Sequence, residues 1–215
     1  MKDLYKTVLF DFDGTVFDTG EGIMKSVQYA AEAFGYHEPD WRALRSFVGP
    51  PLVESFARRY GVDAEKAAAM CAKYRERYAE KGIDECRVYP GVIELVRFLR
   101  TRGIKSAVAT GKPTPFTVDI LSRHGVLEDF DAVLGSEFDG TRGQKWEVIT
   151  ELLKRFGREG AVMVGDRDND VRGALRCNIP CIGVSWGYAE PGELEAAGAV
   201  CVASDTDELK NILMR

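Results

Sequence analysis

Six short apolar runs, rich in Val, Ile, Leu and Ala, recur along the chain and constrain its fold more than any other feature. They cover residues 7–10, 104–109, 132–134, 161–164, 179–184 and 199–202, and most are flanked by Gly, Pro or Asp. Several of the intervening segments have the apolar spacing of a helix. Because parallel strands need long crossovers, this alternation predicts an α/β fold, a doubly wound parallel sheet with a Rossmann-like core.

Two of the predicted helices have clear boundaries. One covers about residues 92–99, after Pro90 and before Gly103, and the other covers about 148–156. Residues 18–86 break the alternation, because they hold helical patterns, interrupted at Gly49 and Gly61, and no convincing strand. We therefore predict an α/β core formed by residues 1–17 and 87–215 and an inserted helical subdomain formed by residues 18–86.

Composition excludes several classes of protein. The formal net charge is -5 and the basic residues are scattered, which disfavours nucleic acid as a partner. The N-terminal stretch is acidic and no apolar run reaches the length of a membrane span of about 18 residues, so neither a signal peptide nor membrane insertion is expected. The five cysteines include no CxxC and have only two histidines as companions, which disfavours a zinc site and favours a cytoplasmic location.

An acidic motif follows the first apolar run. Asp11 and Asp13 stand two residues apart where the predicted strand leaves the sheet, and ligands of such sheets bind beyond the carboxyl ends of the strands. An ionised carboxylate can attack phosphorus when a cation screens it from the phosphate. Taken alone, the motif is equally compatible with an ordinary surface turn.

Three further segments supply partners for these acids. Thr110 and Gly111 follow the second run, just before Pro113 and a helix-compatible stretch, a pattern that can bind phosphate or simply cap a helix. Lys145 opens an amphipathic segment and can place an ammonium beside phosphate, although an isolated lysine is usually a surface charge. The ordered set indicates phosphoryl-transfer chemistry more strongly than any single member.

The last segment, Gly165-Asp166-Arg167-Asp168-Asn169-Asp170, again places acids at a strand end. Asp166 and Asp170 stand four residues apart, and magnesium prefers hard oxygen ligands from a few carboxylates. Capping of the next helix explains Asp168 or Asn169 but leaves Asp166 unexplained. We therefore predict Mg²⁺ as the cofactor.

These four segments, in this order, resemble the four motifs of the haloacid dehalogenase-like hydrolase superfamily. The resemblance covers essentially the whole chain. The segments 165–174 and 182–188 are similar to its phosphoglycolate phosphatase-like branch, and Phe47-Val48-Gly49-Pro50-Pro51-Leu52 resembles the cap loop of that branch and of 5′-nucleotidase-like members. The resemblance implies a phosphatase, a phosphoric monoester hydrolase that passes through an aspartyl phosphate.

Residue by residue, the resemblance implies Asp11 as the nucleophile and Asp13 as general acid and then base. Thr110, the amide of Gly111 and Lys145 would hold the transferring phosphate. The metal ligands would be Asp11, Asp166 and the backbone carbonyl of Asp13. Asp170 would orient Lys145 or hold metal-bound water. Lys145 lacks the following proline that many relatives have.

Other reactions of α/β proteins fit the sequence less well. Dehalogenases of the superfamily lack the acid at the position of Asp13, so its presence here disfavours dehalogenation. Members that cleave phosphonates use a lysine of the cap. The lysines of that segment, Lys66, Lys73 and Lys81, have the pattern of exposed helix charges, which disfavours phosphonate cleavage. Gly183-Val184-Ser185-Trp186-Gly187 fits the GxSxG motif of serine hydrolases. Both histidines precede Ser185, however, and that template needs a histidine after the serine.

The expected substrate is a small phosphate monoester, with phosphoglycolate and a nucleoside 5′-monophosphate left unranked. Arg45, Arg58 and Arg59 are candidates for its polar end. Two alternatives stay open: a phosphosugar mutase with the same aspartate chemistry, and a catalytically silent relative that binds metal or a partner. A monomer is the expected state, with a dimer left open.

Overall fold

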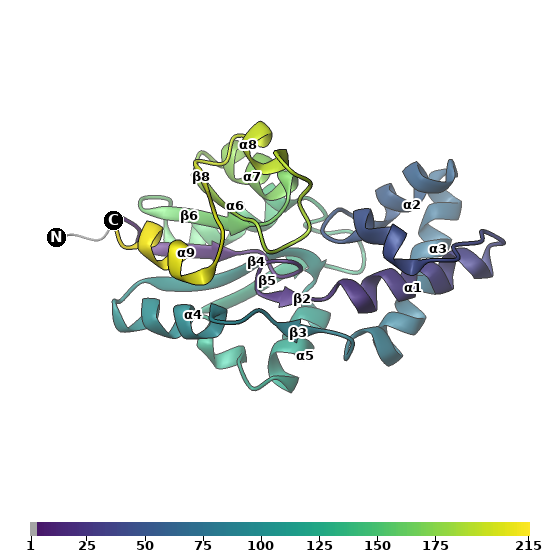
Figure 1. Cartoon of the computed structure of the whole chain (residues 1–215), viewed down its shortest axis with the longest axis horizontal. Helices are drawn as coiled ribbons and strands as arrows, with labels where there is room; N and C mark the ends of the chain where they lie inside the picture. The colour runs from purple at the N-terminus through teal and green to yellow at the C-terminus, as the bar shows by residue number, and fades with distance from the viewer. Residues whose placement is uncertain (1–3) are drawn as a thin grey trace. The chain divides into compact units, whose positions relative to one another are not determined.

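A computed structural model of the chain describes residues 4–215 and contains a six-stranded parallel sheet (Figure 1). The strand order is β5-β4-β1-β6-β7-β8. All six predicted strands are confirmed: β1 (Thr7–Phe10), β4 (Lys105–Pro113), β5 (Ala132–Ser136), β6 (Ala161–Gly165), β7 (Cys181–Val184) and β8 (Cys201–Ala203). The α/β prediction with a doubly wound parallel sheet is therefore confirmed.

The strand order places β1 at the centre of the sheet. From β1 the chain builds β4 and β5 on one side, and β6, β7 and β8 on the other, so the direction of winding reverses beside β1. Open parallel sheets bind ligands at this switch point, outside the carboxyl ends of the strands. The residues that follow β1 and β6 are therefore placed at the position where a ligand is expected.

Along the chain, helices lie between the strands of the six-stranded sheet and after the last of them. They are α4 (Val92–Thr101), α5 (Thr114–Arg123), the short η3 (Leu127–Asp129), α6 (Lys145–Phe156), α7 (Asp168–Arg176), α8 (Glu193–Ala197) and α9 (Thr206–Leu213). The apolar faces of α6 and α7 pack on Leu9, Ala107 and Met163 in one buried cluster. On the opposite face of β1, the ring of Phe10 meets Phe130 edge to face. The sheet is thus covered on both faces, which explains why its strands are continuously apolar.

Residues Asp18–Arg87 form a separate compact unit, and the second unit joins the residues up to Phe17 to Val88–Arg215. The helical unit contains α1 (Gly20–Ala33), the 3₁₀ segment η1 (Trp41–Phe47), α2 (Leu52–Tyr60), α3 (Ala64–Arg77) and the single π-helical turn η2 (Tyr78–Gly82). Gly61 ends α2 with a φ of 64°, as its position in the sequence suggested. The side chain of Asp63 caps α3 by accepting a hydrogen bond from Lys66 N.

Close helix packing in this unit depends on two glycines. A Cβ at Gly22 of α1 would lie 2.1 Å from the carbonyl oxygen of Gly82, and a Cβ at Gly82 would lie 2.8 Å from Ser26 Oγ. The contact is therefore possible only without side chains at these positions. Two very short strands that the sequence pattern did not indicate, β2 (Phe17–Asp18) and β3 (Arg87–Val88), pair where the chain enters and leaves the unit.

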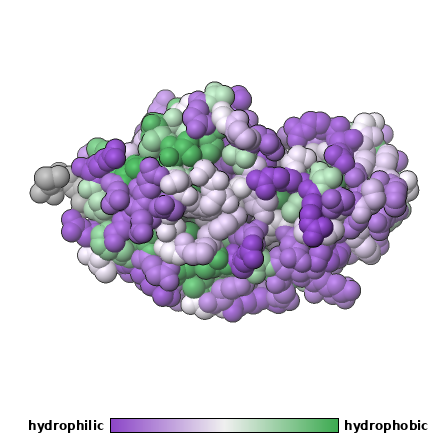
Figure 2. Space-filling model, viewed as in Figure 1, coloured by the Kyte–Doolittle hydropathy of each residue, from purple (hydrophilic) through white to green (hydrophobic). Residues whose placement is uncertain are grey.

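The face in Figure 2 is mostly hydrophilic, with small apolar patches. Among the described residues the large apolar side chains that are exposed are Leu4, Tyr29, Val53, Phe138, Leu175 and Val200. Scattered residues of this kind are normal on a protein surface. Within residues 4–215, no helix combines the length and the apolar character that crossing a membrane requires.

Candidate active site

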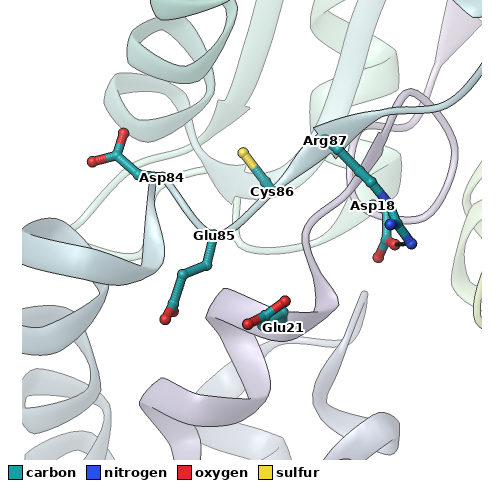
Figure 3. Close-up of a pocket in the computed structure, with 6 residues that line it drawn as sticks. All are labelled: Asp18, Glu21, Asp84, Glu85, Cys86 and Arg87. Carbon is teal, nitrogen blue, oxygen red and sulfur yellow. Dashed lines mark hydrogen bonds and ion pairs between the residues drawn. The ribbon is translucent and has the colours of Figure 1, made fainter.

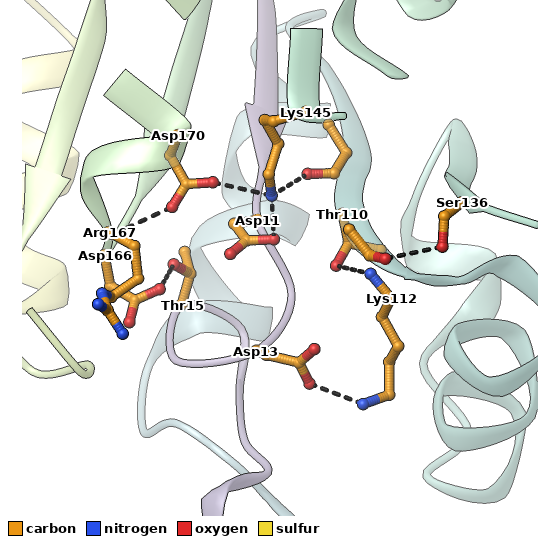
Figure 4. A network of polar contacts seen from close by, with 12 residues as sticks. Asp11, Asp13, Thr15, Thr110, Lys112, Ser136, Lys145, Asp166, Arg167 and Asp170 are labelled. Atoms are coloured by element: carbon orange, nitrogen blue, oxygen red, sulfur yellow. Dashed lines mark hydrogen bonds and ion pairs between the residues drawn. The ribbon is translucent and has the colours of Figure 1, made fainter. Parts of the chain in front are cut away.

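Acidic residues converge at the carboxyl edge of the sheet, the edge where the parallel strands end. Asp11 follows β1, Asp166 follows β6, and Lys145 is the first residue of α6 (Figure 4). Asp11, Lys145 and Asp166 are each at least nine-tenths buried. Charged groups are rarely buried without partners, so their contacts define the site.

Lys145 joins two of the acids. Its Nζ lies 2.6 Å from Asp11 Oδ1 and 2.8 Å from Asp170 Oδ1, and it also donates to the carbonyl of Ala109 at 3.1 Å. Burial alone would lower the pKa of Lys145, but attraction to the two carboxylates outweighs burial and raises its pKa above the ordinary value. The ammonium is therefore charged at neutral pH and is fixed at the carboxyl edge.

Asp166 is held by hydrogen bonds from opposite ends of the chain. Thr15 Oγ1 donates to its Oδ1 at 3.0 Å, and the backbone N–H of Tyr188 donates to its Oδ2 at 2.8 Å. Two glycines approach the same carboxylate, because a Cβ at Gly14 would lie 2.1 Å from Oδ2 and one at Gly187 would lie 2.3 Å from it. Gly14 also has a φ of +88°, which side chains disfavour. This packing fixes the orientation of the Asp166 carboxylate.

Asp11, Asp166 and Asp170 together form a candidate metal site. Each offers a carboxylate oxygen, and the three oxygens lie within 4.8 Å of one another. Burial, and then repulsion from Asp170, raises the pKa of Asp11 to about 7. Burial together with repulsion from Asp11 and Asp170 also raises the pKa of Asp166 well above its usual range. Lys145 contacts only two of these three carboxylates, so a cation bound by hard oxygen ligands fits this cluster.

The structure refines the position of Asp170. Its Oδ2 accepts a hydrogen bond from the backbone N–H of Arg167 at 3.1 Å, while its Oδ1 faces Lys145. The two roles considered from the sequence, orienting Lys145 and supporting a metal, are therefore both compatible with its position. The side chain is completely buried.

The second apolar run, residues 104–109, is shorter than the strand that contains it, because β4 continues to Pro113. The register against β5 shifts between Ala109 and Pro113, so Thr110 and Gly111 lie in an irregular part of the strand, and α5 begins only at Thr114. Thr110 Oγ1 accepts from Lys112 N at 3.1 Å, and Ser136 Oγ donates to the carbonyl of Gly111 at 2.7 Å. These side-chain hydrogen bonds stabilise an extension that apolar patterning does not indicate.

Lys112 is a site residue that the sequence pattern did not single out. Its Nζ lies 2.9 Å from Asp13 Oδ1, and the two side chains are only 4% and 9% exposed. Lys112 was visible in the Thr-Gly-Lys-Pro segment, but a buried lysine has no local signature that distinguishes it from a surface lysine. Each acid of the Asp11-Phe12-Asp13 motif thus has its own lysine, Lys145 for Asp11 and Lys112 for Asp13.

The GxSxG segment, residues 183–187, packs against the carboxylate cluster and does not present its serine as a nucleophile. Ser185 is exposed, whereas Gly187 and the N–H of Tyr188 lie against Asp166. Trp186 Nε1 also donates to the carbonyl of Thr15 at 3.2 Å. The segment therefore forms a wall of the carboxylate cluster.

Arg59, one of the three arginines considered for substrate contact, has an intramolecular partner. Its guanidinium donates to both carboxylate oxygens of Glu38 at 2.9–3.1 Å, and Tyr60 Oη donates to the same carboxylate at 2.9 Å. Arg59 therefore links α2 to the segment between α1 and η1. Arg58 is exposed.

A separate cavity of about 260 Å³ lies within the helical unit (Figure 3). Its lining residues are Asp18, Glu21, Asp84, Glu85, Cys86 and Arg87. Asp18 pairs with Arg87 at 2.9 Å, and Glu85 pairs with Arg77 at 2.8 Å. The cavity includes none of the site residues predicted from the sequence.

Comparison with known proteins agrees with this geometry. The chain is 41% identical over 211 residues to a 5′-nucleotidase of Pseudomonas aeruginosa, covering 97% of this chain and 96% of the relative. It is 35% identical to the tyrosine-protein kinase PtkA of Mycobacterium tuberculosis, covering 96% and 72%. It is 26% identical to a phosphoglycolate phosphatase of Vibrio parahaemolyticus, covering 97% and 96%.

The same fold is present in a crystal structure of a predicted phosphatase from Clostridium acetobutylicum. That protein is 40% identical, with a TM-score of 0.95 and coverage of 98% of both chains. Residues 8–184 match the family model described as haloacid dehalogenase-like hydrolase, and this range contains all the carboxylates and both lysines of the site. The chain therefore belongs to the haloacid dehalogenase-like hydrolase family.

Proposed function

We propose that the protein is a magnesium-dependent phosphatase that hydrolyses a small phosphate monoester through a phosphorylated Asp11. The observation that carries the proposal is the buried contact of Asp11 with Lys145, within a cluster of three carboxylates to which Asp11 belongs. A carboxylate held at a ligand-binding edge, beside a fixed ammonium and a cation site, has what phosphoryl transfer needs: positioning and charge neutralisation.

In the first half of the proposed reaction, a carboxylate oxygen of Asp11 forms a bond to phosphorus while the bond from phosphorus to the ester oxygen breaks. The leaving oxygen takes a proton from Asp13. The ammonium of Lys145, together with Thr110 and the amide of Gly111, stabilises negative charge on the transferring group. The products of this half are an alcohol and the phosphorylated Asp11.

In the second half, water attacks the phosphorus and gives a proton to Asp13, and the bond from phosphorus to Asp11 breaks. Inorganic phosphate leaves, and both aspartates return to their starting states. Bound magnesium, with Asp11, Asp166 and the carbonyl of Asp13 as its proposed ligands, would neutralise charge on the phosphate. Asp170 supports the site by orienting Lys145.

Among small monoesters, a nucleoside 5′-monophosphate is the first candidate and phosphoglycolate the second. This order follows the two relatives, because the 5′-nucleotidase is 41% identical and the phosphoglycolate phosphatase is 26% identical. In this proposal the helical unit of residues 18–87 acts as the cap that selects the substrate. Closure of such a unit would exclude water during attack on phosphorus.

Phosphate release from nucleoside monophosphates, phosphoglycolate, sugar phosphates and 4-nitrophenyl phosphate tests the proposal, with magnesium and with chelator. We expect release that requires magnesium and is abolished in Asp11→Asn. Asp207→Asn is the matched control, because Asp207 is an exposed acid of α9. Mass spectrometry after an acid quench should locate phosphate on Asp11.

A folded protein that releases no phosphate from any of these esters would contradict the proposal. Turnover of a sugar phosphate that depends on an added bisphosphate would identify a mutase with the same aspartate chemistry. Full activity of Asp11→Asn would reject Asp11 as the nucleophile.

A further inference from the structure

The second lysine of the site has a backbone that is fixed from two sides. The N–H of Lys112 donates to Thr110 Oγ1 at 3.1 Å, and its carbonyl oxygen lies 2.1 Å from where a Cβ at Gly135 would be. Gly135 belongs to the neighbouring strand β5, so a larger residue there would displace this part of β4. The irregular extension of β4 thus holds Lys112 in one position.

The side chain of Lys112 points to Asp13 (Figure 4). Its Nζ donates to Asp13 Oδ1 at 2.9 Å, and both side chains are almost completely buried. Burial of two charges is costly unless their geometry is good, and a buried pair of this kind is better suited to fixing an orientation than to adding stability. The pair therefore needs an explanation beyond the folding of the core.

Lys145 and Lys112 contact different acids of the Asp11-Phe12-Asp13 motif. Lys145 contacts Asp11 and Asp170, whereas Lys112 contacts Asp13, the residue that exchanges protons in the proposed function. A carboxylate that exchanges a proton with a leaving oxygen must be within hydrogen-bond reach of it. Small errors of placement reduce rates strongly, so a group that fixes the Asp13 carboxylate affects the rate without touching the phosphate.

We propose that Lys112 is a positioning residue whose buried ammonium holds Oδ1 of Asp13 and thereby fixes the carboxyl group in the orientation from which its other oxygen exchanges a proton with the leaving oxygen. This inference rests on the proposed function. It makes a specific kinetic prediction, because the need for a proton depends on the leaving group. The alkoxide of a nucleoside monophosphate requires protonation, whereas 4-nitrophenolate leaves without it.

The experiment compares kcat/KM for a nucleoside 5′-monophosphate and for 4-nitrophenyl phosphate in Lys112→Met. The ratio kcat/KM reports the steps up to release of the leaving group, so later hydrolysis of the aspartyl phosphate does not enter it. We expect a loss of about 10- to 100-fold for the nucleotide and a much smaller loss, below about 3-fold, for the aryl ester. Lys112→Arg, which keeps the charge, should recover part of the loss.

Two further variants separate positioning from a general effect. In the Asp13→Asn background, adding Lys112→Met should reduce nucleotide turnover by less than about 3-fold, since the group that Lys112 positions is already removed. The matched control is Lys105→Met, because Lys105 also lies on β4 and pairs with an aspartate, Asp131, at 2.9 Å, but is 56% exposed. Lys105→Met should retain the nucleotide-to-aryl ratio of the wild type.

Equal losses for both esters, additive losses in the Asp13→Asn background, or full nucleotide turnover in Lys112→Met would each overturn the proposal. A large rise in the inhibition constant of inorganic phosphate would also overturn it, because Lys112 would then bind phosphate itself. If Lys112→Met does not fold, Lys112→Gln carries the same comparison of substrates, because its shorter, neutral side chain removes the ammonium from Asp13. Wild-type protein without turnover would refute the proposed function together with this inference, whereas active wild type with an unaffected Lys112 variant would refute the inference alone.

Discussion

Substitution of Gly187 by alanine is expected to disturb the candidate metal site without removing any ligand. A Cβ at this position would lie 2.3 Å from Asp166 Oδ2 and 2.4 Å from Asp166 Cβ. Ordinary contacts begin near 3.4 Å, so the carboxylate or the loop has to move by about 1 Å. Asp166 has little room to move, because it is completely buried and the backbone of Gly14 approaches the same oxygen.

The displacement would weaken the hydrogen bonds that orient Asp166, from Thr15 at 3.0 Å and from Tyr188 N at 2.8 Å. Loss of such orienting contacts around a metal ligand typically reduces metal affinity by about 10- to 100-fold, equivalent to about 1.4–2.8 kcal/mol. We expect a loss of this size for Mg²⁺ in Gly187→Ala. Activity should fall at low magnesium and recover in part at high magnesium.

Calorimetric titration with Mg²⁺, together with the magnesium-induced rise in Tm, measures the effect. Ser185→Ala is the control, because it changes the same segment at an exposed side chain and should keep wild-type affinity and activity. Magnesium affinity of Gly187→Ala within about twofold of the wild type, in a folded protein, would refute the reasoning. Loss of activity in Ser185→Ala would instead revive the serine hydrolase interpretation.

Three further perturbations test other parts of the structure. Burial and the Asp170 carboxylate raise the pKa of metal-free Asp11 to about 7, and a metal binds the ionised form. Magnesium binding at about pH 6 should therefore release most of a proton from Asp11, and Asp166, whose pKa is also raised, should add to this release. Affinity should rise with pH up to about 8; calorimetry in buffers of different ionisation enthalpy measures this, and a flat profile would contradict it. Lys145→Met leaves two buried carboxylates without their ammonium partner. In urea denaturation it should lower the free energy of unfolding by about 3–5 kcal/mol, whereas the same substitution of a surface lysine should lower it by less than about 1 kcal/mol. Gly22→Ala places a Cβ 2.1 Å from the carbonyl oxygen of Gly82 and should destabilise the protein by about 1–3 kcal/mol. An unchanged urea midpoint would contradict this prediction, because it would show that α1 and η2 can move apart at no cost.

Much of the fold was predictable because a strand that is buried on both faces of the sheet has a recognisable sequence pattern. Strands covered by helices on both sides are continuously apolar, so the six strands were visible as short runs of Val, Ile, Leu and Ala. The location of the acidic site residues was predictable as well, because acids that directly follow such runs must lie at one edge of a parallel sheet. Asp11 and Asp166 were predicted together on this basis, and the structure brings them within one carboxylate cluster.

The boundaries of β4 and the environment of single side chains were decided only by tertiary contacts. The extension of β4 to Pro113 depends on hydrogen bonds with Ser136 and its neighbours on β5, which no local pattern encodes. Lys112 is buried because it meets Asp13, 99 positions earlier in the chain. Gly187 matters because it lies against Asp166.

The sequence by itself therefore determined the strands, the helical insertion and the order of the acidic motifs, since these depend on periodicity and on residue type at strand ends. Tertiary structure decided which lysine serves which aspartate and which glycines enclose the carboxylates. A charged or small residue has no periodic signature. Its burial and its partner are set by distant segments that the folded sheet brings together.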